Sequence, residues 1–112
     1  MPVVRFFTRE HCGLCKDGLE VVEREMARAF GPPRLAYAPC TCGPTSVVRR
    51  VEYVDGSVLQ VIDVDGEPEL KMRFGFEVPV VEVEGGPTFS LQLDARALAG
   101  ELQRIRAMEA TP

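Results

Sequence analysis

Two cysteines separated by two residues stand near the start of the chain, in the stretch Thr8-Arg9-Glu10-His11-Cys12-Gly13-Leu14-Cys15-Lys16. Residues 2–7 before it are rich in β-branched and aromatic side chains, which favours a β-strand. After it, apolar side chains recur every three or four residues, as on one face of a helix: Leu19, Val22, Met26 and Phe30. Gly31 and two prolines then end the pattern. The cysteine pair is therefore predicted to lie where a strand turns into a helix.

This position favours reactivity of Cys12. Near a helix N-terminus, unpaired amide groups and the positive end of the dipole stabilise an anionic thiolate. Cys15 follows one helical turn later and is close enough to form a disulfide with Cys12. Dithiol–disulfide exchange needs such a thiolate and a second thiol within reach. A structural role is the alternative, because zinc sites use the same spacing.

The composition restricts the class of protein. A chain of 112 residues is expected to form a single domain over residues 1–112. Its net charge of −4, with no basic block, argues against a nucleic-acid partner, and no apolar run is long enough for a membrane span. Without a secretory signal, a cytoplasmic location with reduced thiols is expected. Four cysteines in that setting point to catalysis or metal binding.

The middle of the chain begins with a loop and continues with a hairpin. Residues 31–45 are rich in Gly and Pro, contain Cys40 and Cys42, and are predicted to be a loop. Residues 47–54 and 57–64 flank Asp55-Gly56 and are predicted to be antiparallel strands. A helix over residues 46–54 is the alternative, although its β-branched content disfavours it.

The last third is predicted to contain a short helix, a second hairpin and a final helix. Residues 66–75 have Pro near the start, acids before bases, and Gly at the end, an order typical of a short helix. Residues 78–84 and 87–93 flank Gly85-Gly86 as a second hairpin. Asp94 is a suitable N-cap for the last helix. Four of that helix's apolar residues are expected to face inward: Leu98, Leu102, Ile105 and Met108.

In this order of elements, the CxxC motif and Val78-Pro79 resemble the thioredoxin superfamily, most closely its glutaredoxin-like proteins. Residues 62–65, 68–70 and 73–75 also carry the resemblance. It implies an α/β fold, with a four-stranded mixed sheet flanked by three helices. Residues 32–56 would be an insertion that supplies a loop or an extra strand between the first helix and the family's second strand. The resemblance also implies a cis peptide bond before Pro79, with Pro79 beside the cysteines.

The resemblance assigns roles to individual residues. Cys12 matches the nucleophilic cysteine and Cys15 the resolving one, while the backbone of Val78 and Pro79 matches the loop that pairs with an extended substrate. Arg9 matches a position at which glutaredoxins often keep a cation that helps to hold glutathione. His11 replaces the tryptophan of thioredoxins, and the glycine pair and acid that grip glutathione in glutaredoxins are missing.

The chain is thus expected to be a thiol–disulfide oxidoreductase that acts on a disulfide-containing protein or a small thiol and needs no organic cofactor or metal. Arg9, Val78 and Pro79 are its expected substrate-binding residues. Cys40 and Cys42 form a possible second thiol pair, which could relay electrons, complete a four-thiolate metal site with Cys12 and Cys15, or play no part. The alternative function is a thiolate metal- or cluster-binding module on a thioredoxin-like scaffold.

Overall fold

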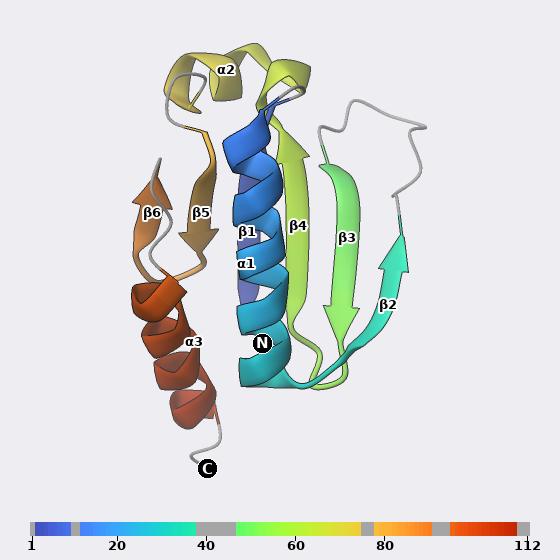
Figure 1. Cartoon of the computed structure of the whole chain (residues 1–112), viewed down its shortest axis with the longest axis vertical. Coiled ribbons are helices and arrows are strands. Elements are labelled where there is room, and N and C mark those ends of the chain that lie inside the picture. The colour runs from blue at the N-terminus through green and yellow to red at the C-terminus, as the bar shows by residue number, and fades with distance from the viewer. Residues whose placement is uncertain (1, 10–11, 38–46, 75–77, 91–94, 110–112) are drawn as a thin grey trace.

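The computed structural model describes residues 2–9, 12–37, 47–74, 78–90 and 95–109. These ranges form β1 (Val3–Thr8), α1 (Gly13–Phe30), β2 (Pro33–Tyr37), β3 (Val47–Tyr53), β4 (Val58–Asp63), the 3₁₀ turn η1 (Val64–Gly66), α2 (Pro68–Phe74), β5 (Val80–Val83), β6 (Thr88–Ser90) and α3 (Ala95–Glu109). Within them, six strands form one sheet in the order β2-β3-β4-β1-β5-β6 (Figure 1).

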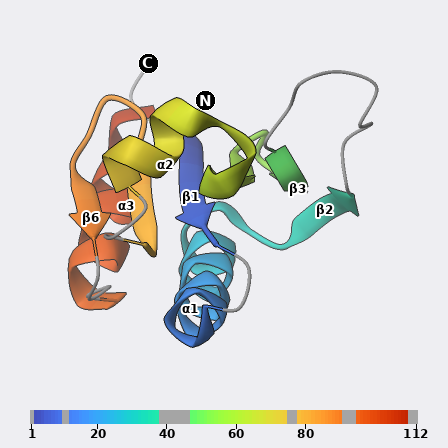
Figure 2. The same cartoon turned by 90° about the horizontal axis from the view of Figure 1, so that it is seen from above.

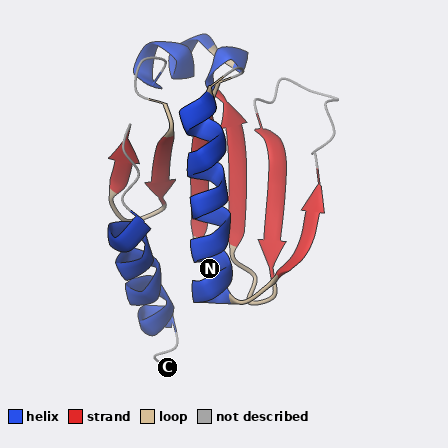
Figure 3. Ribbon diagram, viewed as in Figure 1, coloured by secondary structure: helices blue, strands red, loops and turns tan. Residues whose placement is uncertain are grey.

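The sheet is mixed. β1 runs parallel to β4, with Val3 opposite Val58 and Thr8 opposite Asp63, and the other neighbouring pairs are antiparallel. In the described part of the chain, this sheet and three α-helices are consistent with an α/β thioredoxin-like fold. The expected count of four strands is not confirmed: β4, β1, β5 and β6 are joined by β3 and β2, which extend the sheet on one side (Figure 3).

The extension includes a strand that the sequence did not predict. Residues 33–37 were expected to be loop, but they form β2, with Ala36 opposite Val51 and Tyr37 opposite Arg50 of β3. Pro33 stands at the first position of this edge strand, where its missing N–H is tolerated. The strand over residues 47–53 is confirmed, and the alternative helix there is wrong. Both hairpins are confirmed as well.

Successive side chains of the central strands point to opposite faces of the sheet, and each face carries a buried cluster. Phe6 packs in the larger cluster with Val22 and Met26 of α1, whereas its neighbour Phe7 packs with Phe74 of α2. Figure 1 shows α1 along the sheet and α2 across the end where β1 finishes, and Figure 2 shows β1 between them. The two helices therefore enclose the C-terminal end of β1, the end that leads to the cysteines.

The inward faces of the long helices largely follow the predicted pattern. In α1, Val22, Met26 and Phe30 are buried. In α3, Leu98 and Leu102 are buried and Ile105 is partly buried. Met108 was expected to face inward but is largely exposed, because the last turn of α3 extends past the end of the sheet (Figure 1). Asp94 lies outside the described residues. None of the helices in the described ranges combines the length and apolar character that a bilayer span requires.

Gly31, which ends α1, is predicted to be intolerant of a side chain. Its φ of 89° and ψ of 178° lie in a region that is essentially restricted to glycine, and an added Cβ would lie 2.7 Å from Val54 Cγ2. We expect Gly31→Ala to lower the free energy of unfolding by about 1–3 kcal/mol in urea denaturation. Gly13→Ala is the matched control, because an added Cβ at this first helical position meets no atom within 4 Å. It should leave stability unchanged or raise it, since alanine favours helix.

Candidate functional site

Cys12 is the N-cap of α1. Its backbone is extended, with φ −100° and ψ 105°, and its Sγ accepts a hydrogen bond from the backbone N–H of Cys15 at 3.2 Å. Its carbonyl accepts the first helical bond, from the N–H of Lys16 at 3.3 Å. A side chain that accepts a hydrogen bond from the third residue of the helix is the usual N-cap arrangement, with sulfur here in the place of oxygen. The expected position of Cys12 at the start of the helix is confirmed.

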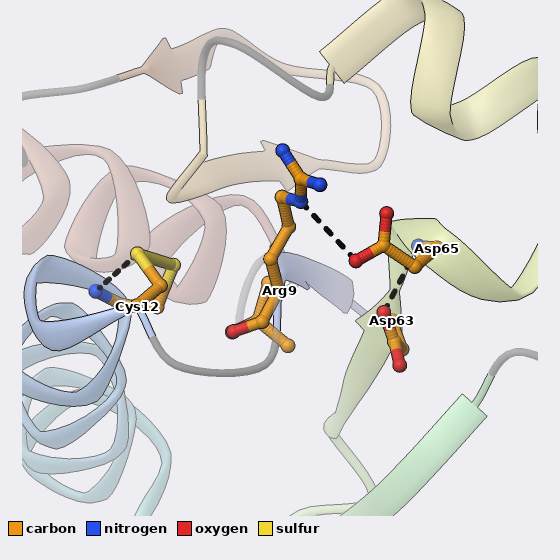
Figure 4. A network of polar contacts seen from close by, with 6 residues as sticks. Arg9, Cys12, Asp63 and Asp65 are labelled. Carbon is orange, nitrogen blue, oxygen red and sulfur yellow. Dashed lines mark hydrogen bonds and ion pairs between the residues drawn. A yellow bond between two sulfur atoms is a disulfide. The ribbon is translucent and has the colours of Figure 1, made fainter.

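The two cysteines differ in exposure. Cys15 is only 3% exposed and belongs to the main core cluster, whereas Cys12 is partly exposed and packs against that cluster. They are joined by a disulfide, with their Cα atoms 5.2 Å apart (Figure 4). This separation lies within the usual range for a disulfide. The site is thus in its oxidised state, with one cysteine partly exposed and the other in the core.

Val78 and Pro79 lie beside the first turns of α1. Val78 packs against both core clusters, and the peptide bond that joins it to Pro79 is cis, as the resemblance implied. Pro79 Cγ lies 3.4 Å from the position that a Cβ on Gly18 would occupy, and the Phe6 ring is equally close. Gly18 is one helical turn after Cys15, so the proline and the phenylalanine both lie against the first turns of α1.

Arg9 reaches away from the cysteines. Its Nε donates a hydrogen bond to Asp65 Oδ2 at 3.2 Å, and the backbone N–H of Asp65 donates one to Asp63 Oδ1 at 2.9 Å (Figure 4). This contact connects the segment before Cys12 with the turn after β4. The Arg9 and Asp65 side chains are both about one-third exposed, so water screens the pair and its contribution to stability is small. Sequence reasoning placed a cation here but did not identify Asp65 as its partner.

Three residues that the sequence singled out lie outside the described ranges: His11, Cys40 and Cys42. Among the residues that are described, no three His, Cys, Asp or Glu side chains gather in a way that could hold a metal ion. Lys16 is exposed on α1. The described site therefore consists of the cysteine pair, the Val78-Pro79 segment and the Arg9 contact.

The structure is that of an α/β protein of thioredoxin-like architecture, with a close cysteine pair at the N-terminus of a helix. The chain belongs to the family described as Glutaredoxin-like domain (DUF836), whose sequence profile matches residues 40–103. These 64 residues (103 − 40 + 1) are more than half of the 112-residue chain. The matched range includes β3 to β6 and part of α3, and begins after Cys15.

Comparison with solved structures gives a similar chain in the X-ray structure of the structural-genomics target protein XcR50 from X. campestris. The alignment covers 97% of this chain and 99% of that one, at 20% sequence identity and a TM-score of 0.48. Comparison with curated proteins gave no match.

Proposed function

We propose that this protein is a thiol–disulfide oxidoreductase of glutaredoxin-like type, with Cys12 as its nucleophile and Cys15 as its resolving cysteine. The observation that carries the proposal is the asymmetry of the pair. Cys12 is partly exposed at the N-cap of an 18-residue helix, and Cys15 is buried one turn along within bonding distance. The family membership supports the same chemistry. A partly exposed cysteine can meet a partner, and a buried one can meet only its neighbour.

In the first step, the reduced protein presents Cys12 as a thiolate. The N–H of Cys15 and the helix dipole stabilise this anion. The sulfur attacks one sulfur of the partner's disulfide, and the partner's S–S bond breaks. Its leaving sulfur takes both electrons of that bond and is protonated from water. The product is a mixed disulfide between Cys12 and the partner.

In the second step, Cys15 loses its proton and attacks the Cys12 sulfur. The mixed disulfide breaks, the partner's sulfur takes both electrons of that bond and a proton from water, and the Cys12–Cys15 disulfide of the structure forms. Two electrons have passed from the protein to the partner. Two equivalents of a thiol reductant return the pair to the dithiol by the reverse exchange. The chemistry requires no organic cofactor.

The Val78-Pro79 segment is the proposed contact for the partner's backbone. It precedes β5 and lies against α1 near the cysteine pair, so an extended segment bound along it would bring a disulfide toward Cys12. Arg9 is the proposed cation for an anionic partner such as glutathione. Because Asp65 already pairs with it, an anionic group would have to share or replace that contact. A protein disulfide and a small disulfide both fit this chemistry.

The thiolate assignment predicts different alkylation by iodoacetamide at the two cysteines. In a background with Cys40→Ser and Cys42→Ser, the Cys15→Ser variant should react at Cys12 with a rate that rises around a midpoint below pH about 8.5. The matching Cys12→Ser variant should react more slowly at neutral pH, because Cys15 is buried. Mass spectrometry of both variants from pH 5 to 10 measures the profiles. Faster reaction at Cys15 would reverse the assigned roles.

A relay through Cys40 and Cys42 remains a prediction, since both lie outside the described residues. Val47, which follows them, is opposite Ile62 in the sheet. It therefore lies at the same end of the strands as the Thr8–Asp63 pair, after which the chain leads to Cys12. Partial oxidation of the Cys15→Ser variant, followed by peptide mapping, should yield a bridge from Cys12 to Cys40 or Cys42. If only adducts of Cys12 with small thiols form, the second pair has no part in the exchange.

A further inference from the structure

Val78 and Pro79 together present few main-chain hydrogen-bonding groups to a partner. The N–H of Val78 donates a hydrogen bond to the carbonyl of Phe74, with 3.2 Å between nitrogen and oxygen. Pro79 has no N–H. Phe74 is the last residue of α2, so this bond satisfies a carbonyl that has no partner within its own helix. The Val78-Pro79 segment therefore has no free main-chain donor.

The end of α2 is fixed by its packing, so this donor is not readily released. Phe74 is 6% exposed, and the centroid of its ring lies 4.5 Å from that of Phe7. Val78 packs against the same cluster, which also contains Val80 of β5. Opening the bond would leave the Phe74 carbonyl without its partner and disturb this packing. The N–H of Val78 is thus expected to stay bonded when a partner arrives.

The carbonyl of Val78, in contrast, is an acceptor without a donor. No residue in the described part of the chain donates a hydrogen bond to it. Val78 is partly exposed and directly precedes Pro79, which lies against the first turns of α1. A main-chain carbonyl accepts hydrogen bonds and cannot donate them. The free main-chain capacity of Val78 is therefore that of an acceptor alone.

We infer that the site selects partners whose half-cystine carries an amide N–H, as in a peptide or an N-acylated cysteamine, and does not bind the partner's carbonyl. The inference rests on the proposed function and names what the Val78-Pro79 segment recognises. Directly opposite residues of an antiparallel pair can exchange both of their N–H···O=C bonds. Here only the bond in which the partner donates can form. A disulfide without that N–H leaves the Val78 carbonyl unfilled when it covers the segment, which weakens its binding.

Three uncharged disulfides test this selection: diacetylcystamine, its ester counterpart dithiodiethanol diacetate, and diacetylcystine bis(methylamide). The first two are matched in shape and differ in an N–H against an ester oxygen, whereas the third adds a second carbonyl. Formation of the Cys12 adduct is followed by intact mass in the reduced Cys15→Ser, Cys40→Ser, Cys42→Ser protein. Each rate is divided by the rate of the same disulfide with mercaptoethanol, which corrects for intrinsic reactivity.

The corrected rate should be at least about threefold higher for diacetylcystamine than for the ester, since only the amide fills the acceptor. The added carbonyl of diacetylcystine bis(methylamide) should raise the rate by less than about twofold, because the Val78 N–H is already bonded. The Cys40→Ser, Cys42→Ser protein with an intact CxxC should show the same order in its rate of internal disulfide formation. This second protein keeps the test valid if Cys15→Ser does not fold.

Hydrogen exchange by NMR supplies a measurement that does not depend on the thiol chemistry. In the oxidised protein, the Val78 amide proton should exchange at least about tenfold more slowly than in an unstructured peptide. Equal corrected rates for the amide and the ester would overturn the inference and leave the proposed function standing. A gain of more than about twofold from the added carbonyl, or an unprotected Val78 amide, would do the same. If none of the three disulfides reacts at Cys12, the proposed function is wrong and the inference falls with it.

Discussion

We expect Cys12→Ser to abolish reduction of a small disulfide by the protein, and Cys15→Ser to stop the same reaction after its first step. A serine hydroxyl at residue 12 cannot form the mixed disulfide, so the rate should fall to that of the buffer without protein. Cys15→Ser keeps the nucleophile at the N-cap but removes the group that releases the partner. In a background with Cys40→Ser and Cys42→Ser, in which Cys12 is the remaining thiol, it should therefore accumulate one covalent adduct per chain.

The measurement mixes each reduced variant with excess oxidised glutathione and follows the intact mass over time. Cys40→Ser, Cys42→Ser protein with an intact CxxC is the control, and it should reach the internal disulfide without an adduct that persists. Exchange at an unchanged rate in the Cys12→Ser variant would show that another thiol is the nucleophile. A Cys15→Ser variant that releases its partner as fast as the control would show that Cys15 does not resolve the adduct.

We expect Phe6→Ala to destabilise the fold strongly. Phe6 is 0% exposed, lies in the centre of β1, and packs in the main cluster close to Gly18 of α1. Removing the ring leaves a cavity beneath the helix that carries both cysteines. Truncations of this kind cost about 3–5 kcal/mol, against a total of about 5–15 kcal/mol for a domain. Urea denaturation of the oxidised protein measures the loss.

Met72→Ala is the control for this substitution. Met72 is 86% exposed on α2, so its loss should change the free energy of unfolding by less than about 0.5 kcal/mol. The disulfide is short-range and is present in both variants, so it does not contribute to the difference. Equal losses in the two variants would show that the Phe6 ring does not pack as described.

Much of the fold could be predicted because its signals are local. The β-branched run of β1, the helical spacing of Val22, Met26 and Phe30, and the glycine turns at Gly56 and Gly85 each appear within a few residues. The position of Cys12 at a helix start followed from the same patterns. The cis peptide bond before Pro79 was predicted from the family resemblance, and it is present.

What the sequence did not predict depends on contacts between distant residues. Residues 33–37 have the Gly and Pro neighbours of a loop, yet pairing with β3 makes them a strand. Arg9 finds its partner 56 residues later, at Asp65. The β2–β3 extension beside α1 likewise depends on tertiary contacts, since no sequence motif marks Glu23 of α1 as the ion-pair partner of Arg49 on β3. Such features follow from tertiary structure, which overrides local propensity.

The central claim is that Cys12 and Cys15 form a reversible dithiol–disulfide couple. It is tested most directly by equilibrating the wild-type protein in dithiothreitol buffers of graded redox poise, without oxygen, and measuring intact mass, bound metal and the Cys12–Cys15 peptide. We predict one two-electron transition, with a tenfold change in the ratio of oxidised to reduced protein per 29.6 mV. The loss of two hydrogens should map to Cys12 and Cys15, with no metal bound. A pair that stays reduced throughout, or that retains a stoichiometric metal ion which blocks its oxidation, would contradict the account.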